Sequence, residues 1–473
     1  LNPVHIAQWG TFITAQDVSK NSARLNIRTK IQYDAAAQLQ DSVKQADGTY
    51  VVFDSEIVSL ADVVLQSRLM DAEGNVVGEV ASELQVIPAC PNEVEQEIVV
   101  KNPNLWSVNT PYIYKVNSIL IDKTTGKVLD NYCTNTGIRT FRFDVQKGFI
   151  LNGERLKING VCMHHDLGCL GAAVNIRAIE RQLEILQEMG CNGIRCSHNP
   201  PSPELLDLCD RMGFIVMDET FDMWRKRKTA HDYSRYFNEW HERDLTDLIL
   251  RDRNHPSVFI WSIGNEVPTQ CSAEGYKVAS FLQDICHRED PTRPVTCGMD
   301  QVSCVLENGF AAMIDVPGLN YRAHRYVESY NALPQNIILG SETASTVSSR
   351  GVYKFPVEKR AGATYADHQS SGYDVEYCSW SNVPDEDFAL ADDYDWTIGQ
   401  FVWTGFDYLG EPSPYDTDAW PSHSSVFGII DLASLPKDRY YLYRSIWNKT
   451  ANTLHVLPHW TWPGREGENT PVF

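Results

Sequence analysis

The feature that most constrains the fold of this chain is a change of hydrophobic period near residue 149. Downstream of it, short apolar runs read as strands at 157–161, 193–195, 214–217, 258–261, 294–297, 313–316, 337–339 and 399–403. Helical stretches separate most of them, including 176–189, 203–212, 237–251, 273–288 and 438–447. Eight β-α units predict a parallel sheet closed into a (β/α)8 barrel. A doubly wound sheet is the alternative, but no glycine-rich dinucleotide loop follows the first strand.

The first third of the chain has a period of two instead. Ala23, Leu25 and Ile27 alternate with Arg24 and Asn26, as in a strand with one buried and one wet face. Further short strands are indicated at 63–65, 98–100 and 112–116, together with one helical stretch at 34–45. This spacing predicts an antiparallel β-sandwich with a structural role, because nothing catalytic is visible in it.

Charge and hydropathy exclude two classes of partner. With 41 Lys and Arg against 62 Asp and Glu, the formal net charge is −21, which disfavours binding to nucleic acid. No run of eighteen apolar residues occurs, so no membrane-spanning helix and no membrane partner are expected. The twelve cysteines show no zinc or redox spacing, and most, such as Cys162 and Cys209, suit small buried thiols. The spacing of the cysteines neither predicts nor excludes a disulfide bond.

The barrel prediction indicates where chemistry would lie, because active sites of such barrels form at the carboxyl ends of the strands. Reading off those ends gives His164, His165, Asp166, Arg195, His198, Asp218, Glu219, Asn265, Glu266, Asn320, Tyr321, Glu342, Trp403 and Asp407. Glu266 and Glu342 end the fourth and seventh strands and can face one pocket. Glycosidic bond cleavage needs such a pair, one acid to protonate the leaving oxygen and one carboxylate to attack the sugar.

Several motifs at these strand ends resemble family 2 glycoside hydrolases. Trp-Ser-Ile-Gly-Asn-Glu at 261–266 is similar to the acid/base signature of that family, and Leu-Gly-Ser-Glu-Thr at 339–343 to its nucleophile segment. Further similar segments lie at 160–164, 193–200, 315–321 and 401–407. Upstream, the segments at 105–107, 111–114 and 136–140 resemble the immunoglobulin-like sandwich of the family. The resemblance implies a multidomain chain, with an immunoglobulin-like antiparallel β-sandwich before a catalytic (β/α)8 TIM barrel.

The resemblance also implies roles for individual residues. Glu342 would be the nucleophile and Glu266 the general acid/base, with retention of configuration. Substrate-binding positions carried over from the family are His164, Arg195, His198, Asn265, Tyr321 and Trp403, with Asp222 and Asp407 in support. For this chemistry the pKa of Glu266 must be raised, by burial or by the neighbouring carboxylate. Glu342 must stay ionised, and Arg195 with the Tyr321 hydroxyl would stabilise that form.

The identity of the sugar rests on finer points of the resemblance. Glucuronidases of the family carry an Asn-x-Lys pair that grips the uronate, whereas the comparable stretch here, 425–428, lacks the lysine. Lys437 could replace it only with a different geometry. The run at 405–412 resembles β-galactosidase-like members, so terminal β-D-galactosides, as oligosaccharides or other β-glycosides, are the predicted substrates. A β-glucuronidase or another family 2 exo-β-glycosidase is the alternative. A non-catalytic carbohydrate-binding barrel is a rival from another class.

No metal or other cofactor is expected. The best-known galactosidases of the family bind magnesium through a Glu-x-His pair, and Asp222 and Trp224 stand at those places here.

The predicted domains are the sandwich at 1–142, the barrel at 143–455 and the start of a further β domain at 456–473. The chain would then be a piece of a longer bacterial protein, weak or inactive alone, and periplasmic or secreted rather than cytoplasmic. Homo-oligomerisation stays open.

Overall fold

The computed structural model describes residues 2–34, 43–44, 50–51, 60–415 and 420–473 of the chain. It divides into one unit of residues Leu1–Thr140 with Leu250–Pro256 and a second unit of Phe141–Ile249 with Ser257–Phe473. The first boundary lies within two residues of the sequence-based one. The helical stretch expected at 34–45 lies mostly outside the described residues.

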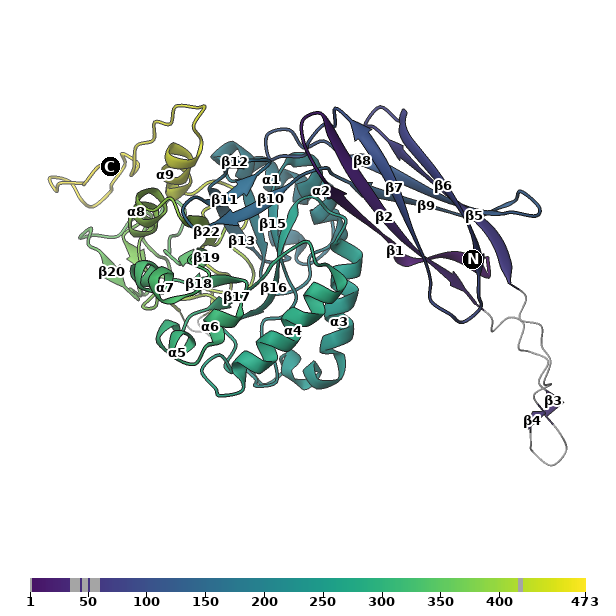
Figure 1. Cartoon of the computed structure of the whole chain (residues 1–473). Coiled ribbons are helices and arrows are strands. Elements are labelled where there is room, and N and C mark those ends of the chain that lie inside the picture. The colour runs from purple at the N-terminus through teal and green to yellow at the C-terminus, as the bar shows by residue number, and fades with distance from the viewer. Residues whose placement is uncertain (1, 35–42, 45–49, 52–59, 416–419) are drawn as a thin grey trace. The chain divides into compact units, whose positions relative to one another are not determined.

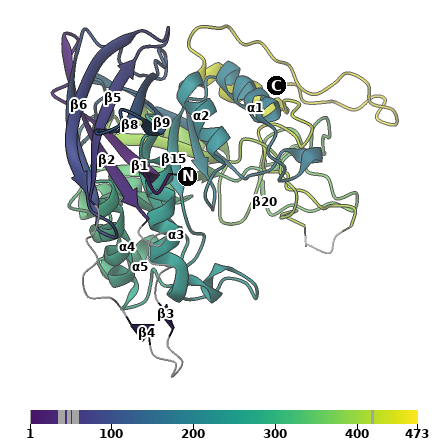
Figure 2. The ribbon, with the colours of Figure 1, turned by 90° about the vertical axis from the view of Figure 1, so that its right-hand side faces the viewer.

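The first unit is the expected antiparallel sandwich of two sheets (Figure 2). One sheet has the order β1 (Val4–Gln16), β2 (Ser22–Tyr33) and β7 (Asn92–Lys101). The other has the order β6 (Val76–Val86), β5 (Ala61–Met70), β8 (Tyr114–Asp122) and β9 (Val128–Thr136). Leu25 and Ile27 of the first sheet pack with Leu69 and Val116 of the second, so the alternation in the sequence does build the core. The short strands β3 (Val43–Lys44) and β4 (Tyr50–Val51) pair with each other.

The second unit begins with a small antiparallel sheet that leads into the barrel. It consists of β10 (Phe141–Asp144), β11 (Gly148–Leu151) and β12 (Glu154–Arg155). The Phe149 ring packs against Phe259 with centroids 5.4 Å apart, which ties this sheet to a barrel strand.

Eight parallel strands close into the predicted barrel, with helices around its outside (Figure 1). The strands are β13 (Ile158–Met163), β14 (Gly193–Cys196), β15 (Ile215–Glu219), β16 (Val258–Asn265), β17 (Val295–Met299), β18 (Val316–Asn320), β19 (Ile338–Ala344) and β22 (Thr397–Trp403). The helices are α1 (Ile176–Met189), α2 (Pro203–Met212), α3 (Phe237–Asp252), α4 (Gly275–Glu289), α5 (Val302–Glu307), α6 (Phe310–Met313), α7 (Tyr326–Ala332), α8 (Pro384–Asp393) and α9 (Asp438–Trp447).

Local signals explain the boundaries of the clearest helix. Asn175 caps α1 by accepting from the Ala178 backbone N–H, and Gly190 ends it in the left-handed conformation. Ile179, Leu183 and other apolar residues of one face are buried against the barrel. The amphipathic spacing thus predicted α1 to the residue.

The sixth strand is where the sequence-based prediction was wrong. The apolar run at 313–316 was expected to be the strand, but Met313 ends α6 and β18 begins only at Val316. The true strand contains Pro317 and Gly318, two residues that strands generally disfavour. Its apolar pattern is therefore weak, although every residue in it is buried.

Two segments outside the barrel strands shape this unit further. The connection from β19 to β22 holds α8 and the paired strands β20 (Arg360–Ala361) and β21 (Glu376–Tyr377). Residues 456–473 contain no helix or strand and pack on that connection, with the Trp462 and Phe355 rings 5.1 Å apart. That this segment starts a further domain stays a prediction.

One disulfide joins Cys271, after β16, to Cys304 in α5, 33 residues later. Cys162, Cys209, Cys286 and Cys297 are free and buried, as expected. In the described ranges, no helix combines the length and the apolar content needed to cross a bilayer.

Candidate active site

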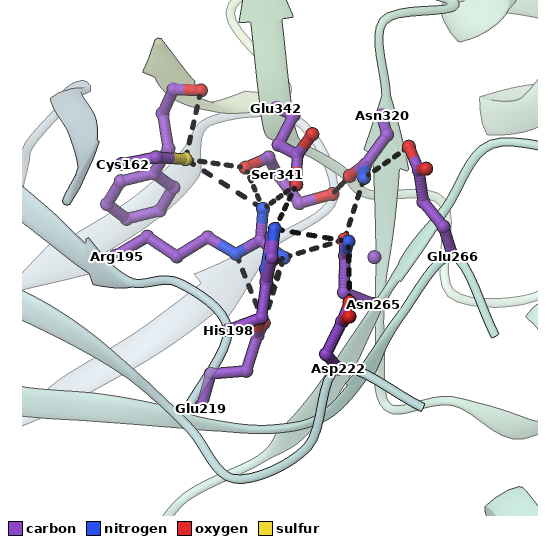
Figure 3. Close-up of polar contacts among 12 residues, drawn as sticks. Cys162, Arg195, His198, Glu219, Asp222, Asn265, Glu266, Asn320, Ser341 and Glu342 are labelled. Atoms are coloured by element: carbon purple, nitrogen blue, oxygen red, sulfur yellow. Dashed lines mark hydrogen bonds and ion pairs between the residues drawn. The ribbon is translucent and has the colours of Figure 1, made fainter. Parts of the chain in front are cut away.

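A buried guanidinium lies at the centre of the barrel mouth, between two carboxylates (Figure 3). Arg195 comes from β14, Glu342 from β19 and Glu219 from the end of β15. Arg195 Nη1 donates to Glu342 Oε1 at 2.6 Å, and Nη2 donates to Glu219 Oε2 at 2.9 Å. Arg195 and Glu219 have no exposed surface, so the pairing is screened little by water. The Arg195 guanidinium therefore holds the Glu342 carboxylate in place.

Glu266 follows β16 and has a different environment from Glu342. Its Oε1 accepts a hydrogen bond from Asn320 Nδ2 at 3.0 Å, so the carboxyl group is paired with a neutral amide and not with a cation. Burial raises the pKa of Glu266 to about 7, and the charges of Glu342 and Asp300 add to the rise. This agrees with the raised pKa expected from the sequence.

Two polar partners of Glu342 favour its ionised form, although burial and the charge of Glu219 leave its pKa raised overall. Burial raises the pKa of Glu342, while the Arg195 guanidinium and the Tyr321 hydroxyl oppose that rise. Tyr321 OH accepts from Ser345 Oγ at 3.0 Å, which leaves its own proton free to donate to Glu342. One carboxyl thus has a cation and a phenol as partners, and the other has an amide.

An amide network connects the two glutamates. Asn265 Oδ1 accepts from Arg195 Nη2 and from Asn320 Nδ2, both at 2.9 Å, and Ser341 Oγ donates to Asn320 Oδ1 at 2.6 Å. These bonds fix which way each amide points, so the Asn265 Nδ2 group is turned away from Arg195. Gly298 makes room for the network: a Cβ there would lie 2.8 Å from Asn265 Oδ1.

Two histidines and a tryptophan form one wall of the site. The His198 ring stacks on Trp403 at 5.2 Å and 5°, and the His164 ring meets Trp403 edge-on at the same distance. Burial lowers the pKa of His164 to about 4 and that of His198 well below its ordinary value. His198 Nδ1 lies 2.7 Å from Glu219 Oε1, so the neutral ring donates there and leaves Nε2 as an acceptor.

These side chains surround a cavity of about 600 Å³. Its lining is His164, His198, Asp222, Lys228, Thr229, Asn265, Glu266, Asp300, Tyr321, Arg322, Glu342, Trp380, Trp403 and Glu411. The structure therefore brings eight of the ten sequence-predicted site residues to one cavity. The exceptions are Arg195, which lies beneath it, and Asp407.

Asp407 belongs to a buried ion pair behind the cavity. Lys437 Nζ lies 2.8 Å from Asp407 Oδ1 and 2.7 Å from the Ser348 carbonyl, and both charged side chains are almost fully buried. Asp407 Oδ1 also accepts from the Gly428 N–H at 2.8 Å. Asp407 thus supports the segments after β19 and β22.

The residues at the place of the family's magnesium ligands do not fit a divalent cation. The Asp222 carboxylate already accepts from the Lys228 ammonium at 2.6 Å. The Trp224 indole is buried and donates its N–H to the Ile263 carbonyl at 2.7 Å, so it offers no ligand atom.

Sequence reasoning missed several residues of the cavity wall. Lys228 lies in the long β15–α3 connection, where its only signal was a short basic run beginning at Arg225. Asp300 comes one residue after β17, and Arg322 comes two residues after β18, directly after the predicted Tyr321. Glu411 lies beyond β22, and its Oε2 accepts from the Tyr408 hydroxyl. Its place in the wall could not be deduced from spacing.

Comparison with known proteins agrees with this architecture. The model of the TIM barrel domain of glycosyl hydrolases family 2 matches residues 143–417, and a second model of the same family matches residues 4–139. Beta-galactosidase BoGH2A of Bacteroides ovatus is 45% identical over 98% of this chain and 56% of its own length. A beta-glucuronidase of Bacteroides fragilis is 26% identical over 96% of this chain and 61% of its own length.

A solved structure is similar over the same extent. The crystal structure of a family 2 member from Bacteroides cellulosilyticus superimposes with a TM-score of 0.81 at 31% identity, over 99% of this chain and 56% of that one. The chain therefore spans about half the length of the relatives that it matches. Because a family model covers more than half of the chain, this chain belongs to glycosyl hydrolase family 2.

Proposed function

We propose that the protein is a retaining exo-glycosidase that cleaves terminal β-D-galactosides. The observation that carries the proposal is the unequal environment of two glutamates on one cavity. Glu342 is paired with the Arg195 guanidinium, whereas Glu266 accepts from an amide and has a pKa raised to about 7. An ionised nucleophile beside a protonated acid is what glycoside cleavage requires.

In the proposed reaction Glu342 attacks the anomeric carbon while Glu266 gives its proton to the departing glycosidic oxygen. The sugar is then esterified to Glu342 and the aglycone leaves as a neutral alcohol. Glu266, now ionised, removes a proton from water, whose oxygen displaces Glu342 and restores both carboxyls. Retention requires carboxyl groups about 5–5.5 Å apart, and the first sugar anomer released tests it directly.

The other predicted residues suit the binding of a sugar. Asn265 Nδ2 lies 3.3 Å from His198 Nε2 and 3.5 Å from Asp222 Oδ1. In exchange for one of these partners it would donate to the 2-hydroxyl, a contact that strengthens in the transition state. Trp403, one face of which is covered by the His198 ring, would support the sugar ring where it lines the cavity, and neutral His164 and His198 would bind hydroxyls. Tyr321 would hold Glu342 ionised until attack.

The charge of the cavity wall favours a neutral sugar over a uronate. Besides the protonated Glu266, four carboxylate residues line it with two cationic ones: Asp222, Asp300, Glu342 and Glu411 with Lys228 and Arg322. Lys228 is already bound to Asp222, and Lys437 is buried in its pair with Asp407. A uronate would therefore enter a negative field without a dedicated cation. The name of the 45% identical relative, a beta-galactosidase, supports the same choice.

A β-glucuronidase is the second candidate, favoured by Arg322 in the cavity wall. Its Nη1 donates to the Trp380 carbonyl at 2.7 Å, and another nitrogen of the guanidinium would have to bind the uronate. A non-catalytic carbohydrate binder has no need of a buried acid and nucleophile pair.

A panel of p-nitrophenyl β-glycosides, assayed with the protein in its full natural length, tests the proposal. We expect kcat/KM for the galactoside to exceed that for the glucuronide at least about 100-fold, which corresponds to about 2.7 kcal/mol of discrimination. Faster glucuronide cleavage would favour the second candidate. Failure to cleave any glycoside would favour the non-catalytic one. Proton NMR of the first product, with the β anomer expected, tests retention.

We also propose a periplasmic or secreted location. The Cys271–Cys304 disulfide supports it, because such bonds persist in oxidising compartments. Fractionation of the native bacterium, with the thiol state of these two cysteines measured in each fraction, tests it.

A further inference from the structure

The positively charged Lys228 side chain lies beside the backbone that carries Glu266, the proposed acid. Its Nζ lies 2.6 Å from Asp222 Oδ1 and 2.6 Å from the backbone oxygen of Asn265. An ammonium has three donors, and protein acceptors occupy two of them. The loop that carries it is fixed as well, because the backbone N–H groups of Lys228 and Thr229 donate to Asp232 Oδ2 at 2.7 and 2.8 Å. The ammonium is therefore held in place before any substrate arrives.

The Asn265 carbonyl belongs to the peptide bond that leads into Glu266. Glu266 has φ of 43°, a left-handed conformation that costs free energy in a residue with a Cβ. The N–H of this peptide donates to the Gly298 carbonyl at 2.8 Å, and its C=O accepts from Lys228. The two bonds fix the plane of the peptide, and with it the direction in which the Glu266 side chain leaves the backbone.

We infer that Lys228 is a positioning residue for Glu266: its ammonium holds the 265–266 peptide so that the Glu266 carboxyl faces the glycosidic oxygen, and it balances the charge of Asp222 beside it. The inference rests on the proposed function, in which Glu266 is the proton donor. It does not depend on which sugar is cleaved.

The charged groups around Glu266 give the inference a signature in the pH profile. Glu342 from β19, Asp300 after β17 and Glu411 after β22 are carboxylates whose charges interact unfavourably with that of Glu266. Lys228 acts in the opposite sense and lowers the pKa of Glu266. Removal of its charge therefore keeps Glu266 protonated to higher pH.

The test compares Lys228→Met and Lys228→Arg, with Lys226→Met as the matched control on the exposed part of the same loop. For Lys228→Met we expect kcat to fall about 10- to 100-fold, with KM within about threefold, because a misplaced acid slows protonation more than binding. The basic limb of the kcat/KM profile should move to higher pH. The loss should be smaller for 2,4-dinitrophenyl glycosides, which need little protonation. Lys228→Arg should restore part of kcat and the normal limb, since it keeps the charge.

Several outcomes would overturn the inference. One is a Lys228→Met enzyme that matches Lys226→Met in kcat and in pH profile. Another is a rise in KM alone, which would make Lys228 a substrate-binding group. If thermal unfolding shows that Lys228→Met does not fold, Lys228→Gln replaces it in the test, since glutamine keeps a donor for the Asn265 carbonyl and removes the charge. A basic limb that does not move in Lys228→Gln then contradicts the inference.

Glu266→Ala separates the inference from the proposed function. If that variant keeps full activity, the proposed function fails, and if it loses activity while Lys228→Met does not, only the inference fails.

Discussion

Arg195 Nη1 lies 2.6 Å from Glu342 Oε1 at the centre of the barrel mouth, with both side chains buried. The same guanidinium also binds Glu219. Removal of charge from Glu342 therefore leaves Arg195 one carboxylate partner, so the fold can tolerate the change although the proposed chemistry cannot.

Glu342→Gln should abolish hydrolysis and leave the protein folded. We expect kcat to fall at least about 10⁴-fold, because the amide cannot form the glycosyl ester. The melting temperature should stay within about 5 °C of that of the parent protein. Glu154→Gln, at an exposed position, is the matched control. Surviving activity in Glu342→Gln would refute the assignment of the nucleophile.

Glu266→Ala should make the rate depend strongly on the leaving group. Dinitrophenyl glycosides depart without a proton donor, so their first step should slow by less than about tenfold. For phenyl or alkyl glycosides the loss should be about 10²–10⁴-fold, the usual contribution of general acid catalysis. Values of kcat/KM over a series of phenols of increasing pKa measure this, because kcat/KM reports the first step and not the later hydrolysis of the glycosyl ester. Equal losses across the series would show that another group donates the proton.

The pH dependence follows from the raised pKa of Glu266. Because that pKa is about 7, the acid is protonated below neutrality and loses its proton above it. We expect kcat/KM to decline above about pH 7 by up to tenfold per pH unit. In Glu266→Ala this basic limb should disappear for a dinitrophenyl substrate. Its persistence there would assign the limb to another group.

The same shift has a consequence for stability, with the opposite sign to that of a salt-bridged carboxylate. The folded-state pKa lies above the ordinary value, so the folded protein holds this proton more tightly than the unfolded chain does. The resulting contribution is present at acid pH and is lost as the pH rises to about 7. Glu266→Gln should therefore unfold at a higher temperature than the parent at pH 8, with a smaller difference at pH 5. Calorimetry at both pH values measures it.

Lys437→Met should destabilise the protein strongly, because it leaves Asp407 buried without its cation. Loss of one partner of a buried pair costs about 3–5 kcal/mol. Replacement of both, Lys437→Met with Asp407→Asn, should recover much of that, and Lys359→Met on the surface should cost little. Urea unfolding of the parent, of Lys437→Met, of Asp407→Asn, of the double variant and of the surface control measures the coupling. An additive double variant would show that the two side chains do not interact.

The sequence predicted the parts of the fold that carry regular apolar spacing. The alternation around Leu25 and the amphipathic face of α1 each bury one side of a regular element, and both predictions were confirmed. The prediction of the sixth strand failed because this strand is buried on all sides by the closed barrel. It therefore tolerates Pro317 and Gly318, two residues that give no strand-like apolar pattern.

For the site, strand ends and motifs were informative, whereas loops were not. Glu266, Glu342 and Asn265 lie at strand ends, and barrel closure brings them to one cavity. Lys228 and Glu411 reach the same cavity from long connections, whose paths depend on tertiary contacts such as the bonds to Asp232 and Tyr408. Such contacts leave no periodic trace in a sequence.

Gly298, which has no side chain, limits which substitutions the site can accept. Even alanine would push one methyl group into the oxygen atoms of Asn265 and Asn320, and the guanidinium nitrogen of Arg195 is only 3.2 Å from the same point. Three side chains from three different strands would have to retreat together to make space. Random mutagenesis aimed at new sugar preferences should thus recover variants all around the rim of the mouth and almost none at this glycine.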